Sequence, residues 1–292
     1  MEFNFKDTFN KVSEKTQQTW ENAKTITNEK VLPKVKETSE NTKVMLNNAK
    51  EKISTTITEE EMLDVLNKLY VTSINGIDKV SLPVDDLVED YMSKNKDVES
   101  ACKSLIKNSI IKCTTSGFLS GLGGLGTMIL TLPANLTSVM YVQLRMCCAV
   151  AKMAGYDIHS DQVQTMIYAC LTGSAVSDIL KNAGIQFGTK LGTAMIKKIP
   201  GKTLTAINQK VGFRFVTKFG SKGVVNLGKM VPVVGGIIGG GFDAASTNII
   251  GKNAYNIFVK GELPENDKED IVIDATYEEV DDIDTKMIKE NQ

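Results

Sequence analysis

The sequence has few of the residues on which much protein chemistry depends. Its 292 residues include two arginines, Arg145 and Arg214, one histidine, His159, and one tryptophan. Reading of DNA or RNA bases favours the bidentate arginine side chain, so the scarcity of arginine argues against a nucleic-acid partner. A single histidine also limits acid–base and metal chemistry, and we expect His159 to have a structural role at a loop or helix start.

Catalytic and metal-binding motifs are also missing. The sequence contains no HExxH, GxSxG, P-loop or CxxC pattern, and the glycine run at 121–126 lacks the strand context of a dinucleotide-binding loop. Five cysteines occur without metal-type spacing: Cys102, Cys113, Cys147, Cys148 and Cys170. We therefore expect a non-enzymatic protein without catalytic residues, metal or cofactor, and an enzyme of unrecognised type is the alternative.

The N-terminus also lacks the pattern of a secretory signal. Its first residues, MEFNFKDTF, carry acids where a signal peptide has a basic and then an apolar run. We expect a cytoplasmic protein with reduced thiols.

Charge is balanced over the whole chain but not along it. Lysine and arginine total 34 and aspartate and glutamate total 35. Residues 101–261 carry 17 cations against four acids, net +13, whereas residues 262–292 carry three cations against twelve acids, net −9. We expect the acidic tail, residues 262–292, to be disordered. Its charge also allows it to fold back on the cationic region.

The strongest local signal is a basic stretch without acids between Asp178 and Asp243. Its lysines are interleaved with apolar and aromatic residues, a pattern that favours an anionic lipid surface over nucleic acid. A solvated face without a partner is the alternative. The candidate lipid- or anion-binding residues are Lys181, Lys190, Lys197, Lys198, Lys202, Lys210, Lys218, Lys222 and Lys229.

Both arginines lie in apolar surroundings, which predicts that they are buried. A buried arginine needs a carboxylate partner, preferably a bidentate one. Acids are scarce in this part of the sequence, and we expect Arg145 and Arg214 to pair with Asp178 or Asp243 in some combination. A structural ion pair is the first interpretation and a polar ligand site is the second.

Two apolar segments, residues 113–144 and 230–242, are interrupted by glycine and proline. The first has no charged residue over 32 positions, yet its composition fits a buried helical hairpin better than a membrane span. Reversible insertion into one leaflet is the alternative for both segments. Glycines four residues apart recur, as in Gly184, Gly188 and Gly192, a spacing that allows close helix contact in a membrane or in a soluble core.

Helical periodicity predicts an all-α fold, a multi-helix bundle with glycine-rich helical hairpins. Residues 1–57 repeat weakly every eleven positions, which indicates a long amphipathic helical arm divided at Pro33. Such an arm lies on a lipid surface or stays solvated. Thr58 with Glu61 indicates a helix start, and Asn75-Gly76 indicates a turn. We therefore expect three regions: the arm 1–57, a helical domain 58–261 and the acidic tail 262–292.

Several long blocks occur in the order GFLSGLGGLGTMILTLPANLTSVMYVQLR, AGYDIHSDQV, YACLTGSAVSDILKNAG, AMIKKIPGKTLTAINQKVGFRFVTKFG and NLGKMVPVVGGIIGGGFDAAST. In these blocks the chain closely resembles the EcsC family of bacterial proteins, over about residues 60–261. That family is named for a protein encoded beside an ABC exporter. The resemblance implies a shared helical scaffold and suggests an accessory role in transport or secretion with a membrane-protein partner. It carries no catalytic residues to this chain.

Together these observations predict a protein that binds reversibly to the anionic inner face of the cell membrane. A carrier of lipid or another apolar ligand, with a cavity between the helical hairpins, is the alternative.

Overall fold

Local sequence signals set the helix ends in the computed structural model. The Thr58 side chain accepts a hydrogen bond from the backbone N–H of Glu61 at 3.1 Å, and the Glu61 carboxylate accepts one from the backbone N–H of Thr58 at 2.8 Å. This reciprocal pair is the predicted capping box. The helix ends before Gly76, whose φ of 79° favours glycine and where a Cβ atom would lie 2.3 Å from the Ser81 carbonyl oxygen. The predicted turn at Asn75-Gly76 is thereby confirmed.

The structure describes residues 58–114, 132, 134–185, 193–219, 240–264 and 282–290. The expected arm 1–57 and most of the two glycine-rich hairpin segments lie outside these residues. The helices are α3 (Glu59–Asn75), α4 (Val84–Lys94), α5 (Val98–Thr114), α8 (Ala134–Met153), α9 (Asp161–Leu171), α10 (Val176–Asn182), α11 (Thr193–Ile196), α12 (Gly201–Phe219), α14 (Gly240–Ala254) and α15 (Ile283–Glu290). A 3-10 turn, η2 (Gly173–Ala175), and a π-helical turn, η3 (Tyr255–Lys260), complete the elements. No strand occurs among these described residues, so the predicted all-α multi-helix fold is confirmed.

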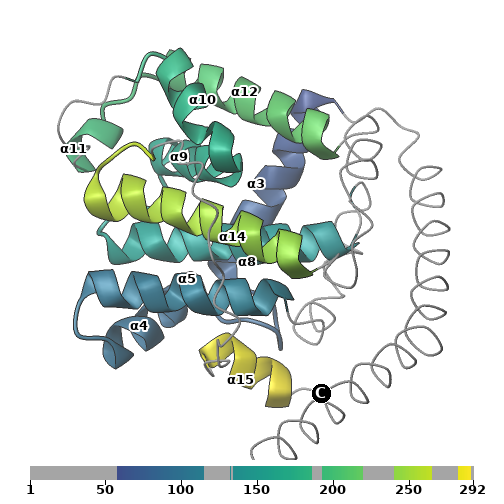
Figure 1. Ribbon diagram of the computed structural model, residues 1–292, viewed down its shortest axis with the longest axis vertical. Coiled ribbons are helices and arrows are strands. Elements are labelled where there is room, and N and C mark those ends of the chain that lie inside the picture. The colour runs from purple at the N-terminus through teal and green to yellow at the C-terminus, as the bar shows by residue number, and fades with distance from the viewer. Residues whose placement is uncertain are drawn as a thin grey trace, which may run out of the picture. The chain divides into compact units, whose positions relative to one another are not determined.

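Helix α8 is the central element of the bundle. It contacts α3, α4, α5, α9 and α14, and its middle and C-terminal part are buried on every side. Figure 1 shows α5, α8 and α14 running beside one another. At Gly251 of α14 an added Cβ atom would lie 2.6 Å from the Ile106 side chain and 3.3 Å from the Met146 sulfur. The absence of a side chain at Gly251 therefore lets α14 pack closely on α5 and α8.

Helix α12 is amphipathic and packs on α3 and α9. Its buried side carries Leu204, Ile207, Val211 and Phe215, at the spacing of one helix face. Burial of these side chains is the main force that holds α12 on the bundle. The opposite side of α12 remains exposed.

One glycine row does not lie on a single helix. Gly184 follows α10 with a φ of 83°, in a turn where its backbone N–H donates to the Lys181 carbonyl. The spacing of Gly184 with Gly188 and Gly192 therefore does not begin on a helical face. Within the described ranges, no helix is both long enough and apolar enough to cross a membrane.

Candidate functional site

Four charged side chains meet inside the bundle. Lys112 of α5 and Arg145 of α8 are 5 % and 4 % exposed, and Asp282 and Asp284 at the start of α15 are 1 % and 2 % exposed. We call these four residues the charge cluster. Its formal charge is zero, because two cations face two carboxylates. Buried charges of this kind need such pairing, since burial of an isolated ion is strongly unfavourable.

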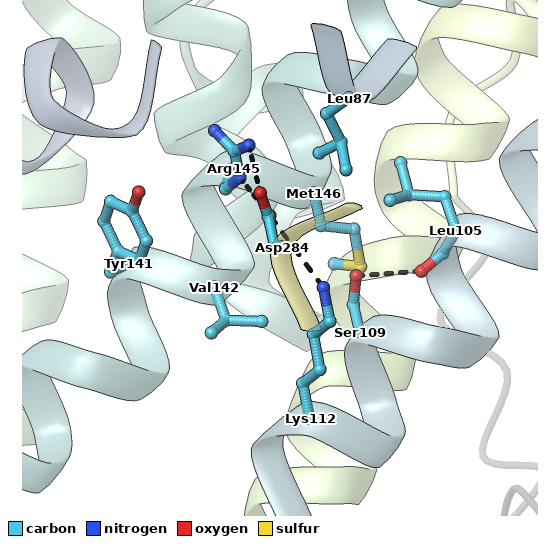
Figure 2. Close-up of a pocket in the computed structure, with 9 residues that line it drawn as sticks. All are labelled: Leu87, Leu105, Ser109, Lys112, Tyr141, Val142, Arg145, Met146 and Asp284. Atoms are coloured by element: carbon cyan, nitrogen blue, oxygen red, sulfur yellow. Dashed lines mark hydrogen bonds and ion pairs between the residues drawn. The ribbon is translucent and has the colours of Figure 1, made fainter. Parts of the chain in front are cut away.

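Arg145 binds the Asp284 carboxylate through a bidentate contact. Its Nε atom lies 2.7 Å from Oδ2 of Asp284, and its Nη2 atom lies 2.9 Å from Oδ1. The remaining Nη1 atom donates to the Ser73 carbonyl of α3 at 3.1 Å. Figure 2 shows the guanidinium and the carboxylate facing each other beside Lys112. This parallel arrangement is the strongest geometry available to an arginine–carboxylate pair.

Lys112 forms an ion pair with Asp282 and lies 3.8 Å from Oδ2 of Asp284. Tyr91 of α4 donates from its hydroxyl to Asp282 at 3.0 Å and accepts from the Asn108 side chain at 2.7 Å. Burial alone would raise the pKa of Asp282, but the charge of Lys112 and hydrogen bonds from Lys112 and Thr285 outweigh it and hold that pKa below its usual value. Burial and the nearby Asp282 charge raise the pKa of the Tyr91 hydroxyl.

A small pocket adjoins the charge cluster. It has polar and apolar walls and room for about one water molecule. Its lining residues are Leu87, Leu105, Ser109, Lys112, Tyr141, Val142, Arg145, Met146 and Asp284, as Figure 2 shows. While α15 is in place, this pocket is too small for a lipid chain or another drug-sized ligand.

The predicted arginine pairs are only partly correct. Arg145 is buried against a carboxylate, but the carboxylate belongs to Asp284 and not to Asp178 or Asp243. Asp178 is exposed on α10, whereas the residues on either side of it, Ser177 and Ile179, are buried. Asp243 is half-buried in the first turn of α14, and its charge contributes to raising the pKa of the Cys113 thiol.

The prediction of a buried Arg214 is wrong. Arg214 is exposed on α12, whereas the next residue, Phe215, is buried. Its flanking residues Phe213 and Phe215 suggested apolar surroundings, but adjacent positions on a helix point in different directions. Only one of these two phenylalanines is therefore part of the core.

The acidic tail was expected to be disordered, and for residues 282–290 this prediction is wrong. Residues 283–290 form α15, and the two buried aspartates are Asp282 just before this helix and Asp284 in its first turn. The tail does fold back on the cationic region 101–261, as its charge allowed, through Lys112 and Arg145. The rest of the tail between residues 265 and 281 lies outside the described residues.

The second candidate site is the basic face of α10, α11 and α12. Four of the predicted lysines are exposed on or beside these helices, namely Lys181, Lys197, Lys198 and Lys202, and Lys210 is half-buried. Lys190, Lys222, Lys229 and the side chain of Lys218 lie outside the described residues. We use the name basic face for Lys181, Lys197, Lys198, Lys202 and Arg214. Helix α10 contacts α12, and Figure 1 shows α10, α11 and α12 in the same part of the bundle.

Exposed apolar side chains accompany the basic face. Phe213 is 57 % exposed and Met195 is 44 % exposed. Along α12, Lys202, Gln209 and Phe213 follow one another at intervals that place them on one side of the helix. A cationic and apolar surface of this kind fits the interface of a membrane.

One pattern in the sequence points to the two cations of the charge cluster. Lys112 and Arg145 are the two charges that bracket the uncharged run 113–144. Two such cations, on helices that pack together, are candidates to pair with the same buried acids. Nothing local identifies Asp282 and Asp284 as that partner, because both stand among many acids of the tail.

The cysteines and the single histidine are the other side chains whose chemistry could serve a reaction. Burial raises the pKa of the Cys102, Cys113 and Cys148 thiols to about 12, so these thiols stay protonated and poorly nucleophilic. His159 is exposed in the turn before α9, and its backbone N–H donates to Asp157 at 3.0 Å. Within the part of the chain that the structure describes, no group of three or more His, Cys, Asp or Glu residues is placed to hold a metal ion.

The chain is similar to a known protein family. A model of the EcsC protein family matches residues 2–260. The match includes the N-terminal arm, so the expected start near residue 60 is wrong; the arm's polar composition offers no long block by which to recognise it. The match ends before α15. No curated protein and no solved structure matches the chain.

Proposed function

The chain belongs to the EcsC protein family, and we propose that it is a non-enzymatic protein that binds reversibly to anionic membrane surfaces through its basic face. We further propose that this contact is made from the cytoplasmic side and that the protein serves as an accessory to a membrane protein. The observation that carries the proposal is the exposure of Phe213 and Met195 among exposed cations on α10, α11 and α12.

Charge supplies the first part of the attraction. Each cation near an anionic lipid surface contributes about 1 kcal/mol, so the five cations of the basic face contribute on the order of 5 kcal/mol together. No acid lies between Asp178 and Asp243 in the sequence to weaken this attraction from within the segment. Attraction of this size gives binding that is reversible and sensitive to salt.

Apolar insertion supplies the second part. The exposed Phe213 ring can enter the boundary between headgroups and acyl chains, where it leaves water without losing contacts in the bundle. Lysine side chains around it can bury their carbon chains while their ammonium groups stay at the phosphates. The basic face therefore combines the two contributions that peripheral helices use.

Flotation of the full chain with vesicles tests the proposal. The chain should float with vesicles that contain phosphatidylglycerol in low salt, and it should remain unbound with phosphatidylcholine alone. Raising the salt to about 1 M shortens the screening length from about 10 Å to about 3 Å and should release the chain. A chain that stays unbound with both lipids would contradict the proposal.

The carrier alternative gains no specific support from the described contacts. Helix α14 packs directly on α5 and α8 at Gly251, and the pocket beside Arg145 has room for about one water molecule. Mass spectrometry of lipid that co-purifies with the chain would separate this alternative from surface binding, because a carrier retains lipid in the absence of a membrane.

A further inference from the structure

We propose that Lys112 and Arg145 form an oxyanion-binding site of the helical bundle, which Asp282 and Asp284 of the same chain occupy in this structure and from which a phosphate group can displace them. The proposal concerns a site separate from the basic face and does not depend on membrane binding.

The donors of this site belong to the bundle itself. Arg145 on α8 and Lys112 on α5 supply the charges, and the Tyr91 hydroxyl on α4 supplies a hydrogen bond. Helices α4, α5 and α8 pack on one another, so the three donors remain close to one another when α15 is absent from the site. A planar guanidinium with two donors directed at one carboxylate has the geometry that also binds phosphate.

The acceptors come from a different part of the chain. Asp282 and Asp284 lie in and beside α15, and residues 265–281 separate them from the preceding described segment. The family match ends at residue 260, so it contains both cations but neither carboxylate. The acidic segment is therefore an addition to the matched region that neutralises two cations within it.

The most deeply buried side chains described at the start of α15 are polar. Asp282, Asp284 and Thr285 are buried, whereas the apolar Ile283 and Met287 are half-buried. Thr285 donates its backbone N–H and its hydroxyl to Asp282, so these two bonds stay with the segment when it leaves. Exchange of these carboxylates for another anion of the same charge preserves the charge of the site and therefore has a small net cost.

A phosphate monoester fits the site by charge and by hydrogen bonding. Above its second pKa of about 6 it carries close to two negative charges, the same total as the two aspartates it would replace. The pocket beside Arg145 has room for about one water molecule, so the ligand must replace the aspartates and cannot join them. Among the described residues, the fully buried Asn108 has a side-chain oxygen without a hydrogen-bond partner beside Tyr91, which can accept from the one hydroxyl that inorganic phosphate keeps near neutral pH.

Hydrogen exchange in the full-length wild-type chain tests the displacement. Inorganic phosphate at pH 7.5 should speed amide exchange in residues 282–290, relative to sodium chloride at the same ionic strength, and should leave exchange in α9 unchanged. A parallel sample with phosphatidic acid vesicles, compared with phosphatidylcholine vesicles, shows whether a lipid headgroup acts in the same way. Faster exchange with either phosphate source supports the site and identifies the source. Unchanged or slower exchange with both would overturn the proposal.

Calorimetry on variants tests the site directly. The double variant Asp282→Asn/Asp284→Asn removes the competing charges while keeping side-chain shape. If α15 is docked about nine-tenths of the time, this variant should bind inorganic phosphate roughly tenfold more tightly than the wild type. Adding Arg145→Met should abolish that binding. Equal phosphate affinity in the wild type and the double variant, with cooperative unfolding preserved in both, would overturn the proposal; if the double variant does not fold, the exchange experiment decides.

Discussion

The two arginines of this chain have the same chemistry and opposite environments. Arg145 lies inside the bundle with Asp284, and Arg214 is exposed on α12. The difference follows from helix position, because α8 is surrounded by other helices and α12 has a free side. A matched pair of substitutions can therefore separate the role of a buried arginine from that of a surface one.

We expect Arg145→Met to lower the free energy of unfolding by about 1–3 kcal/mol and to release α15. This is less than the loss for a permanently buried partner, because Asp284 can return to water with its helix. Arg214→Met should change the free energy of unfolding by no more than about 0.5 kcal/mol. Urea unfolding of both variants measures the difference, and equal stabilities would contradict the role of the charge cluster.

Exposed apolar side chains offer a second test at the scale of single residues. Burial of a phenylalanine contributes about 1.5–3 kcal/mol, so Phe213→Ala should weaken binding to anionic vesicles by roughly tenfold or more. Its thermal stability should be unchanged, because Phe213 is 57 % exposed. Val71→Ala on α3 is the control, since Val71 is 56 % exposed and is not on α10, α11 or α12. Vesicle sedimentation at several lipid concentrations gives both affinities; an equal effect of the two substitutions would count against insertion of Phe213.

At the scale of elements, close packing and local capping explain different parts of the fold. The sequence predicts where α3 begins and ends because Thr58, Glu61 and Gly76 act within a few residues. It also predicts that Arg145 needs a carboxylate. It does not identify Asp284, which is 139 positions away and belongs to a segment with the composition of a disordered tail. Pairings over such distances depend on tertiary packing, which local patterns do not contain.

The crossing of α14 with α5 and α8 leads to a prediction about glycine. Gly251→Ala would place a Cβ atom 2.6 Å from the Ile106 side chain, so we expect a loss of about 1–3 kcal/mol in the free energy of unfolding. Gly201→Ala is the matched control, because an added Cβ atom there meets nothing within 4 Å. Denaturant unfolding should show the loss only at Gly251. Equal stability of the two variants would mean that α14 can move away without cost.

Docking of α15 on the bundle should weaken at acid pH. The folded-state pKa of Asp282 lies below the ordinary value of 3.8, so its contribution to stability is complete above that value and is lost as the pH falls through the lowered pKa. Urea midpoints should therefore fall more steeply below about pH 4 in the wild type than in Asp282→Asn. Parallel curves for the two proteins would show that Asp282 is not responsible for the acid dependence.

At the scale of the whole molecule, the near-zero net charge results from cancellation between segments. Part of the tail's negative charge is used inside the bundle, where Asp282 and Asp284 neutralise Lys112 and Arg145. The lysines of the basic face do not take part in that contact and stay exposed. In Figure 1, α15 lies beyond α4 and α5, and α10 and α12 lie at the other end of the view. The two cationic sites therefore have different partners available to them.

Binding of the basic face to anionic membranes is tested most directly by one flotation experiment. The variant Lys197→Glu/Lys198→Glu/Lys202→Glu reverses three exposed charges of that face, and Lys68→Glu/Lys79→Glu/Lys96→Glu makes the same charge change at exposed positions elsewhere. With phosphatidylglycerol vesicles in low salt, the first variant should lose flotation and the second should float nearly as well as the wild type. Equal flotation of the two variants would contradict the account.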